Sequence, residues 1–209
     1  MYKKFKHFVY NQFVPFIKLY KYLTWLIYFN THEEINLVVG AGLSNFKGWF
    51  STDISTLDIT KESDFKKYFA KRKFNKVLAE HVFEHLTLEE IQKVLPNFYK
   101  YSNRSVNIRI AVPDGFHSDR SYIESVKPGG TGAGANDHKN LFTYKSLSEI
   151  FTKYGFKSNL IEYWDNNHNF YTKYFNDNYG YVERCMLNDS RNINGKPNYT
   201  SLIIDFTKE

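Results

Sequence analysis

The chain has 209 residues, of which 42% are hydrophobic and 24% are charged, so it can form one domain with a full core and is not disordered in composition. Its one cysteine, Cys185, excludes an internal disulfide and a cysteine-based zinc site, and it is typical of a protein of the reducing cytoplasm. Five of the lysines behind the net charge of +6 lie in residues 1–30, which hold no acid. Because the remainder is close to neutral, no nucleic-acid-binding face is expected on the main domain.

Residues 1–34 are interpreted as a basic, aromatic helical arm in front of a domain at 35–209. Pro15 predicts a break or kink into two helices, and Lys18 and Lys21 interrupt the apolar run before it reaches the roughly 18 residues of a membrane span. Two interpretations stay open. The arm is an interfacial helix pair on anionic lipid at the inner face of the membrane, or it packs on the main domain or on a second copy of the chain. The apolar positions at helical spacing are Phe5, Phe8, Val9, Phe13, Phe16, Ile17, Tyr20, Leu23, Leu26 and Ile27.

A short apolar strand and a glycine turn begin the main domain. Residues 35–39 predict a buried parallel strand, and the turn Gly40-Ala41-Gly42 lets the backbone come close to a ligand. A second short run, 49–52, ends on Asp53. Strand, glycine turn, strand and acid is the layout of a nucleoside-binding half-site, in which the carboxylate accepts hydrogen bonds from ribose hydroxyls. A plain turn between two core strands is the alternative.

Strands alternate with helices through the rest of the chain. Ser63 is the expected N-cap of the first helix, Thr87 and Glu90 form a capping box at the second, and Gly155 closes the third. This alternation predicts an α/β fold with a Rossmann-like, doubly wound, mainly parallel seven-stranded sheet that has helices on both faces. The further strands are predicted at 57–60, 76–79, 105–112, 157–164 and 200–206, and the helices at 63–71, 87–101 and 144–154.

Polar residues follow several of these strands. Asp53, Asp58, Glu80 with His81, and Asp114 all come where a strand ends, as the glycine turn does. Ligands of parallel sheets bind outside the carboxyl ends of the strands, so these residues predict one site.

The long polar segment 116–140 is expected to be a substrate loop or lid. It holds four glycines between residues 129 and 134, and their backbone amides are candidates for a phosphate or sulfate cradle. Arg184 and Arg191 are candidates for contact with an anionic acceptor, or they pair with Asp189 on the surface.

The order of these motifs resembles the class I S-adenosylmethionine-dependent methyltransferases. The likeness is carried by the glycine turn, by Gly48-Trp49 ahead of Asp53, by the EHVFEHL run at 80–86, and by Val112-Pro113-Asp114. It is similar in particular to the small predicted methyltransferases associated with surface-polysaccharide biosynthesis, which carry LNLGCG, GW, NVD and EHVLEHL. The resemblance covers about residues 35–207. It implies S-adenosylmethionine as the cofactor and O-methylation of a sugar or glycan precursor.

Site residues also follow from the resemblance. It implies that Asp53 binds the ribose of the cofactor, and that Glu80 and His81 line the floor near the sulfonium. Two positions depart from the family pattern: Val38 stands where many methyltransferases have an acid for the amino group of the cofactor, and Ala41 replaces a cysteine. The full set of implied cofactor-binding residues is Gly40, Ala41, Gly42, Asp53, Ile54, Asp58, Ile59, Glu80 and His81.

Transfer of a methyl group to a hydroxyl calls for a general base within hydrogen-bond reach. The candidates are His81, Asp114 and His138, where the preceding acid Asp137 would raise the basicity of His138; a structural role is the alternative for each histidine. His81 and His85 are four residues apart, but the order His-Val-Phe-Glu-His is not the HExxH of zinc enzymes, so no metal site is predicted.

Two other classes of function stay open. A nicotinamide-dependent oxidoreductase would use the same glycine turn, but Asn45 occupies the third glycine position of GxGxxG. A non-catalytic scaffold or binding protein would keep the fold and lose the cofactor, and Val38 together with the basic arm favours it.

Overall fold

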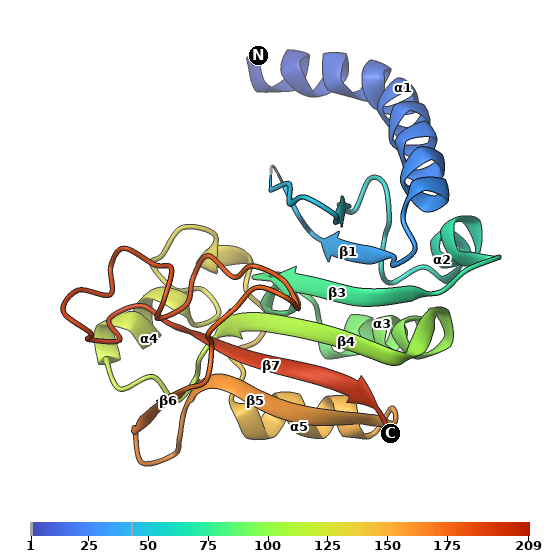
Figure 1. Ribbon diagram of the computed structural model, residues 1–209. Coiled ribbons are helices and arrows are strands. Elements are labelled where there is room, and N and C mark those ends of the chain that lie inside the picture. Colours follow the sequence, from blue (N-terminus) through green and yellow to red (C-terminus); the bar gives the residue numbers. More distant parts are fainter. Residues whose placement is uncertain (1, 43) are drawn as a thin grey trace.

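The computed structural model describes residues 2–42 and 44–209, with side chains in the first helix from Phe13 onward (Figure 1). One seven-stranded sheet organises these residues, and the helices lie beside it or at its edges. The helices are α1 (Tyr2–Thr31), α2 (Glu62–Phe69), α3 (Leu88–Tyr101), α4 (Arg120–Val126) and α5 (Tyr144–Thr152), with the short 3-10 helices η1 (Phe83–His85) and η2 (Ala135–Asp137). The strands are β1 (Asn36–Val39), β2 (Phe50–Ser51), β3 (Phe74–Glu80), β4 (Ser102–Pro113), β5 (Phe156–Trp164), β6 (Phe170–Thr172) and β7 (Ser201–Lys208).

The sheet has the order β2-β1-β3-β4-β7-β5-β6. The pairs from β2 to β4 are parallel, whereas β7 is antiparallel to both β4 and β5, and β6 is antiparallel to β5. The prediction of a seven-stranded, Rossmann-like α/β sheet is confirmed. The expectation that the sheet is mainly parallel holds only for the half that contains β1, β3 and β4.

One predicted strand is wrong, and one observed strand was not predicted. Residues 57–60 form turns, because backbone amides there bond locally: Leu57 N to the carbonyl of Asp53, and Lys61 N to the carbonyl of Asp58. Aspartates favour such local bonds over a strand ladder. The seventh strand is β6, which pairs with β5 across a turn at residues 165–169.

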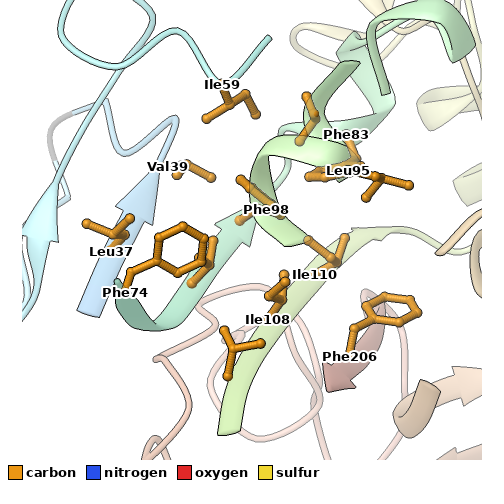
Figure 2. Close-up of a cluster of buried hydrophobic side chains, with 14 of the residues drawn as sticks. Leu37, Val39, Ile59, Phe74, Phe83, Leu95, Phe98, Ile108, Ile110 and Phe206 are labelled. Atoms are coloured by element: carbon orange, nitrogen blue, oxygen red, sulfur yellow. The ribbon is translucent and has the colours of Figure 1, made fainter. Parts of the chain in front are cut away.

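The helices α2, α3 and α5 pack on one face of the sheet (Figure 1). Alternate residues of each strand point to this face, as Leu37 and Val39 do on β1 and Ile108 and Ile110 on β4 (Figure 2). Phe151 of α5 stacks on Phe206 of β7 with ring centroids 3.7 Å apart. This apolar core is the main source of stability, at about 25 cal/mol for each Å² removed from water.

The other face of the sheet is covered differently. Its apolar cluster joins Val38, Leu78 and Ile203 to Tyr174 and Val182, and none of its described members belongs to a helix. The prediction that helices cover both faces of the sheet is therefore wrong. An irregular segment, 173–200, covers this face in place of a second helical layer. We call this segment the cover segment.

Two helix starts show how capping decides element boundaries. Thr87 caps α3 with the predicted box, in which its hydroxyl accepts from the amide of Glu90 and the Glu90 carboxylate accepts from the amide of Thr87. Ser63 is not an N-cap, because α2 begins at Glu62 after Lys61, whose side chain makes no capping bond. Thr143 caps α5, and Gly155 follows it with a φ of +78° as predicted.

The C-terminal part of α1 packs on the main domain. The Trp25 ring is buried and meets Phe50, Tyr68 and Phe69 edge-on, at centroid distances of 5.0 to 5.4 Å. The Arg72 guanidinium donates hydrogen bonds to three carbonyls at the end of the helix, those of Phe29, His32 and Glu33. Packing of the arm on the main domain is thus confirmed for this part.

The remainder of α1 extends away from the sheet as one bent helix that contains Pro15, and not as two helices (Figure 1). No described helix has an apolar stretch long enough to cross a membrane. Contact of the exposed apolar residues of α1 with lipid or with a second copy of the chain stays a prediction. The side chains of Phe5, Phe8 and Val9 lie outside the described residues. The exposed apolar stripe consists of Phe13, Phe16, Leu19, Tyr20, Leu23, Leu26 and Ile27.

Candidate functional site

The site lies where the chain changes direction across the sheet. From β1 the chain moves to β2 on one side, and it then returns to place β3 on the other side of β1. The crevice at the carboxyl ends of two such strands is the usual ligand site of open α/β sheets. Two cavities open there, of about 750 Å³ and about 300 Å³, and both are lined by Gly40, His81 and His85.

Gly40 is required by its surroundings as well as by its backbone. Its φ is +63°, and a Cβ at this position would lie 2.5 Å from Cγ2 of Val82. Gly42 has a φ of +55° and open space around it, and it is not among the residues that line either cavity. The structure thus brings Gly40 and Ala41 to the cavities and leaves Gly42 behind them.

The smaller cavity is mostly apolar, and two acids, Asp58 and Glu90, line it. Its walls are Ile54, Leu57 and Ile59 from the turns after β2, and Val82 and Leu86 from the start of the η1 region. Such a pocket fits a flat heterocycle.

Asp58 is one of the two acids of the smaller cavity; the other, Glu90, belongs to the capping box of α3. Oδ1 of Asp58 accepts hydrogen bonds from the amide and hydroxyl of Thr60, and its Oδ2 lies 2.8 Å from Lys61 Nζ. Burial alone would raise the pKa of Asp58, but these bonds outweigh burial and lower it. The carboxylate therefore stays ionised at neutral pH.

Asp53 caps the turn that follows β2. Its Oδ1 accepts from the amide and hydroxyl of Ser55 at 2.8 and 2.6 Å, and from the amide of Thr56. Burial raises the pKa of Asp53, and these hydrogen bonds reverse the shift and lower it. Asp53 is not among the residues that line the two cavities, and its Oδ2 accepts no hydrogen bond from the described residues.

The larger cavity has polar walls that come from distant parts of the chain. Glu80 at the end of β3 accepts backbone hydrogen bonds from Arg184 at 2.8 Å and Glu183 at 3.2 Å, so this carboxylate holds the cover segment at the cavity wall. Arg191 also lines the cavity and pairs with Asp189, so the predicted pairing is confirmed for Arg191, while Arg184 lines the cavity without an ion pair to Asp189 among the described residues.

The segment 116–140 is less irregular than the sequence predicts, since it contains α4 and η2. Ser125, Val126 and Ala135 from this segment line the larger cavity. The amides of Gly129, Gly130 and Gly132 donate to carbonyls within the same segment, so these three do not offer the predicted anion cradle.

His81 stands between the two cavities in an unusual backbone conformation, with a φ of +52°. Its Nδ1 lies 2.9 Å from Oε1 of Glu84, and its Nε2 lies 3.2 Å from the hydroxyl of Ser201. A residue other than glycine with such a φ is strained, and strain of this kind clusters at functional sites.

His138 lines the larger cavity with its Nδ1 2.6 Å from the carbonyl of Val126. The preceding acid does not face it: Oδ2 of Asp137 lies 3.4 Å from Nδ1 of His85. The predicted pairing of Asp137 with His138 is therefore wrong, and His85 is the histidine that gains the acid.

Asp114 is fully buried and lines neither cavity. Its Oδ1 accepts from the amide of Phe116 and its Oδ2 from the amide of Trp164, so it ties the end of β4 to the end of β5. Burial raises the pKa of Asp114 to about 7. A reacting hydroxyl has no access to Asp114, so it is not a suitable general base. Its role in this structure is to hold the ends of the two strands together.

Glu84 and His85 are among the cavity residues that the sequence-based site omits. Both belong to the EHVFEHL run, but a helical spacing argument pairs His85 with His81 and leaves Glu84 out. The 3-10 geometry of η1 turns Glu84 and His85 toward the cavity together. The motif itself is the signal that would have included them.

No protein-family model matches the sequence, and no curated protein sequence does so. Among solved structures, the chain is similar to a SAM-dependent methyltransferase from Archaeoglobus fulgidus, at 18% identity and a TM-score of 0.45, with 94% of each chain covered. It is similar to the LepI complex with SAM at 8% identity and a TM-score of 0.48, over 90% of this chain and 40% of LepI. Magnesium protoporphyrin IX methyltransferase (ChlM) from Synechocystis PCC 6803 with bound SAH gives 9% identity and a TM-score of 0.42, over 96% of this chain and 84% of ChlM. The chain thus spans about two fifths of LepI, and function is inferred from the site residues.

Proposed function

We propose that the chain is an S-adenosylmethionine-dependent methyltransferase. The observation that carries this proposal is the pair of cavities that meet at Gly40 and His81. S-adenosylmethionine is an elongated molecule with a flat base at one end and a charged amino acid at the other. The smaller, apolar cavity suits the base, and the larger, polar cavity suits the amino acid and the methyl acceptor.

The cofactor contacts follow from this placement. Ile54, Ile59 and Asp58 would hold the adenine, and Oδ2 of Asp53 would reach the ribose hydroxyls. Gly40 and Ala41 would run along the methionine part. Val38 is buried in the second apolar cluster, so we assign the amino group to Glu80, whose oxygens each keep a lone pair beyond the cover-segment amides.

The reaction is an in-line displacement. An oxygen lone pair of the acceptor hydroxyl forms a bond to the methyl carbon while the carbon–sulfur bond breaks, and S-adenosylhomocysteine leaves with the electron pair. The hydroxyl proton passes to a base, which we assign to His81 because it lies at the junction of the two cavities and is oriented by Glu84. Positioning of the acceptor oxygen against the methyl group supplies much of the rate.

We propose a sugar or glycan precursor as the acceptor. The polar walls of the larger cavity support this choice, since Glu183, Arg184 and Tyr199 offer donors and acceptors for several hydroxyls. Segment 116–140 supplies the opposite wall, and we propose that it acts as a substrate lid.

Calorimetric titration with S-adenosylhomocysteine tests the proposal, with NAD as the control ligand. We expect micromolar binding of S-adenosylhomocysteine and none of NAD. Gly40→Ala should weaken this binding at least tenfold, because the new methyl group pushes Val82 into the smaller cavity. Gly48→Ala is the matched control: its φ is +79°, its Cβ would meet no atom within 4 Å, and it lines neither cavity.

Folded wild-type protein that binds neither ligand would overturn the proposal and favour the non-catalytic scaffold. Binding of NAD alone would favour the oxidoreductase. Equal loss of binding in both glycine variants would place the cofactor away from Gly40.

A further inference from the structure

Three side chains with metal-binding atoms meet on the wall of the larger cavity. Glu84 and His85 come from η1, and His138 follows η2, more than fifty residues away in the chain. One oxygen or nitrogen atom from each lies within 4.8 Å of the others. The sequence pattern instead pairs His85 with His81, from which no metal site is predicted.

Both histidines are oriented through Nδ1. The Nδ1 of His138 lies 2.6 Å from the Val126 carbonyl, which can only accept, so Nδ1 carries the proton and Nε2 keeps its lone pair. The Nδ1 of His85 lies 3.4 Å from Oδ2 of the Asp137 carboxylate, a longer contact that favours a proton on Nδ1 over one on Nε2. Metal-binding histidines usually donate their second ring nitrogen to a carbonyl or a carboxylate in this way.

Glu84 adds an observation that does not depend on the histidines. Its side chain has no exposed surface, and neither carboxylate oxygen receives a well-oriented hydrogen bond from the described residues. His81 Nδ1 lies near Oε1, and Oε2 is left without any neighbour of this kind. Burying a carboxylate oxygen that has no partner, as Oε2 is buried here, is costly, and a cation at this position would offset that cost.

The backbone holds the two segments together before any ion binds. The carbonyl of Glu84 accepts from the amide of Lys139 at 2.6 Å, and the carbonyl of Leu86 accepts from Nδ2 of Asn140 at 2.6 Å. The His85 and His138 rings meet edge-on with centroids 4.7 Å apart. Ligand atoms bound to one ion lie roughly 3 to 4 Å apart, so the side chains of Glu84, His85 and His138 would have to shift by about 1 Å to bind the same ion.

We propose that Glu84, His85 and His138 bind one divalent first-row transition-metal ion, with Zn²⁺, Mn²⁺ and Co²⁺ as the ions that two imidazoles and a carboxylate suit best. Three protein ligands leave coordination positions open, and these face the larger cavity. If the proposed methyltransferase function holds, the ion is placed to bind the acceptor oxygen and to ease loss of its proton. The metal site itself does not rest on that function.

The test uses chelator-treated, full-length protein without a histidine tag. Titration with Co²⁺, followed by visible absorption, and with Zn²⁺, followed by calorimetry, should show one ion bound per chain. Glu84→Gln keeps the shape of the side chain and His138→Ala leaves η1 intact; each should weaken binding at least tenfold while the thermal unfolding transition stays cooperative. His168→Ala is the control, since His168 is exposed and lines neither cavity, and this variant should bind the ions as the wild type does.

Wild-type protein that binds no Co²⁺ or Zn²⁺, or a folded His138→Ala variant that binds them unchanged, would overturn the metal site. Titration of the same samples with S-adenosylhomocysteine reports separately on the cofactor site. Metal binding without S-adenosylhomocysteine binding supports the metal site and rejects the methyltransferase, and the reverse result rejects the metal site alone.

Discussion

The two faces of the sheet are built on different principles. The helical face is apolar and is formed by regular elements that contact the strands through Leu, Ile, Val and Phe. The face under the cover segment contains buried charged groups, and these fix an irregular backbone where no helix is present. Consecutive residues of β4 belong to the two faces: Ile108 points into the apolar core, and Arg109 points to the face under the cover segment.

The charged groups of the second face act on backbone and side chains together. Arg109 makes a two-bond contact with Asp205 at 2.8 and 2.9 Å and donates a third bond to the carbonyl of Gly180. Glu162 accepts from the amide of Met186, and Glu80 accepts from two further amides of the cover segment. An irregular segment needs such partners because it cannot satisfy its own backbone groups when buried.

Of the substitutions that compare the two faces, Arg109→Met should lower the free energy of unfolding the most. It leaves the Asp205 carboxylate buried without a partner, and we expect the free energy of unfolding to fall by about 3–5 kcal/mol in urea denaturation. The double variant Arg109→Met, Asp205→Leu removes both charges and should recover most of this loss. A single variant as stable as the wild type would mean that the pair does not hold the second face.

Two buried acids, Glu162 and Asp114, should lower the stability as the pH rises, whereas buried His117, whose pKa is lowered to about 4, contributes in the opposite sense. Burial raises the pKa of Glu162 to about 7, as it does for Asp114, so the folded protein holds these protons more tightly than the unfolded chain. This contribution is complete below about pH 4.5 and is lost as the pH rises through 7, with a slope of at most about 1.4 kcal/mol per pH unit for each group. Urea unfolding at pH 5, 6 and 7 measures it.

Glu162→Gln should flatten that pH dependence. Glu149→Gln on the exposed surface of α5 is the control and should leave it unchanged. A Glu162→Gln variant with the slope of the wild type would show that Glu162 does not titrate in this range.

Ile108→Val should have the smallest effect. It removes one buried methylene on the helical face, which costs about 0.5–1.5 kcal/mol, measured by the same urea denaturation. Ile108 and Arg109 are consecutive residues of β4, so the two variants compare the stability that each face contributes at the same place in the sheet. A loss from Ile108→Val that equals the loss from Arg109→Met would remove the distinction between the faces.

The helical face could be predicted from the sequence because its signals are local. Apolar periodicity located α3 and α5, and Thr87 with Glu90 fixed the start of α3. The second face depends on contacts between residues far apart, such as Glu80 with Arg184, and no local pattern encodes them. The sequence therefore predicted helices there by analogy with alternating folds.

The site divides in the same way. Gly40, Ala41 and His81 follow strands that the sequence locates, and the structure brings them to the cavities. Asp58 reaches the smaller cavity from a turn that the sequence predicts as a strand. The meeting of His138 with His85 depends on how segment 116–140 folds back over η1, which spacing cannot show. Asp114 occupies the expected strand end, but the amide of Trp164 on β5 makes it structural.

Hydrogen exchange with and without S-adenosylhomocysteine tests the central claim, that one ligand occupies both cavities at the ends of β1 and β3. We expect added protection of backbone amides at residues 38–42, 54–60 and 80–86, and none in the β5–β6 hairpin. Protection confined to other segments, or saturating ligand without protection at 54–60, would contradict this account of the site.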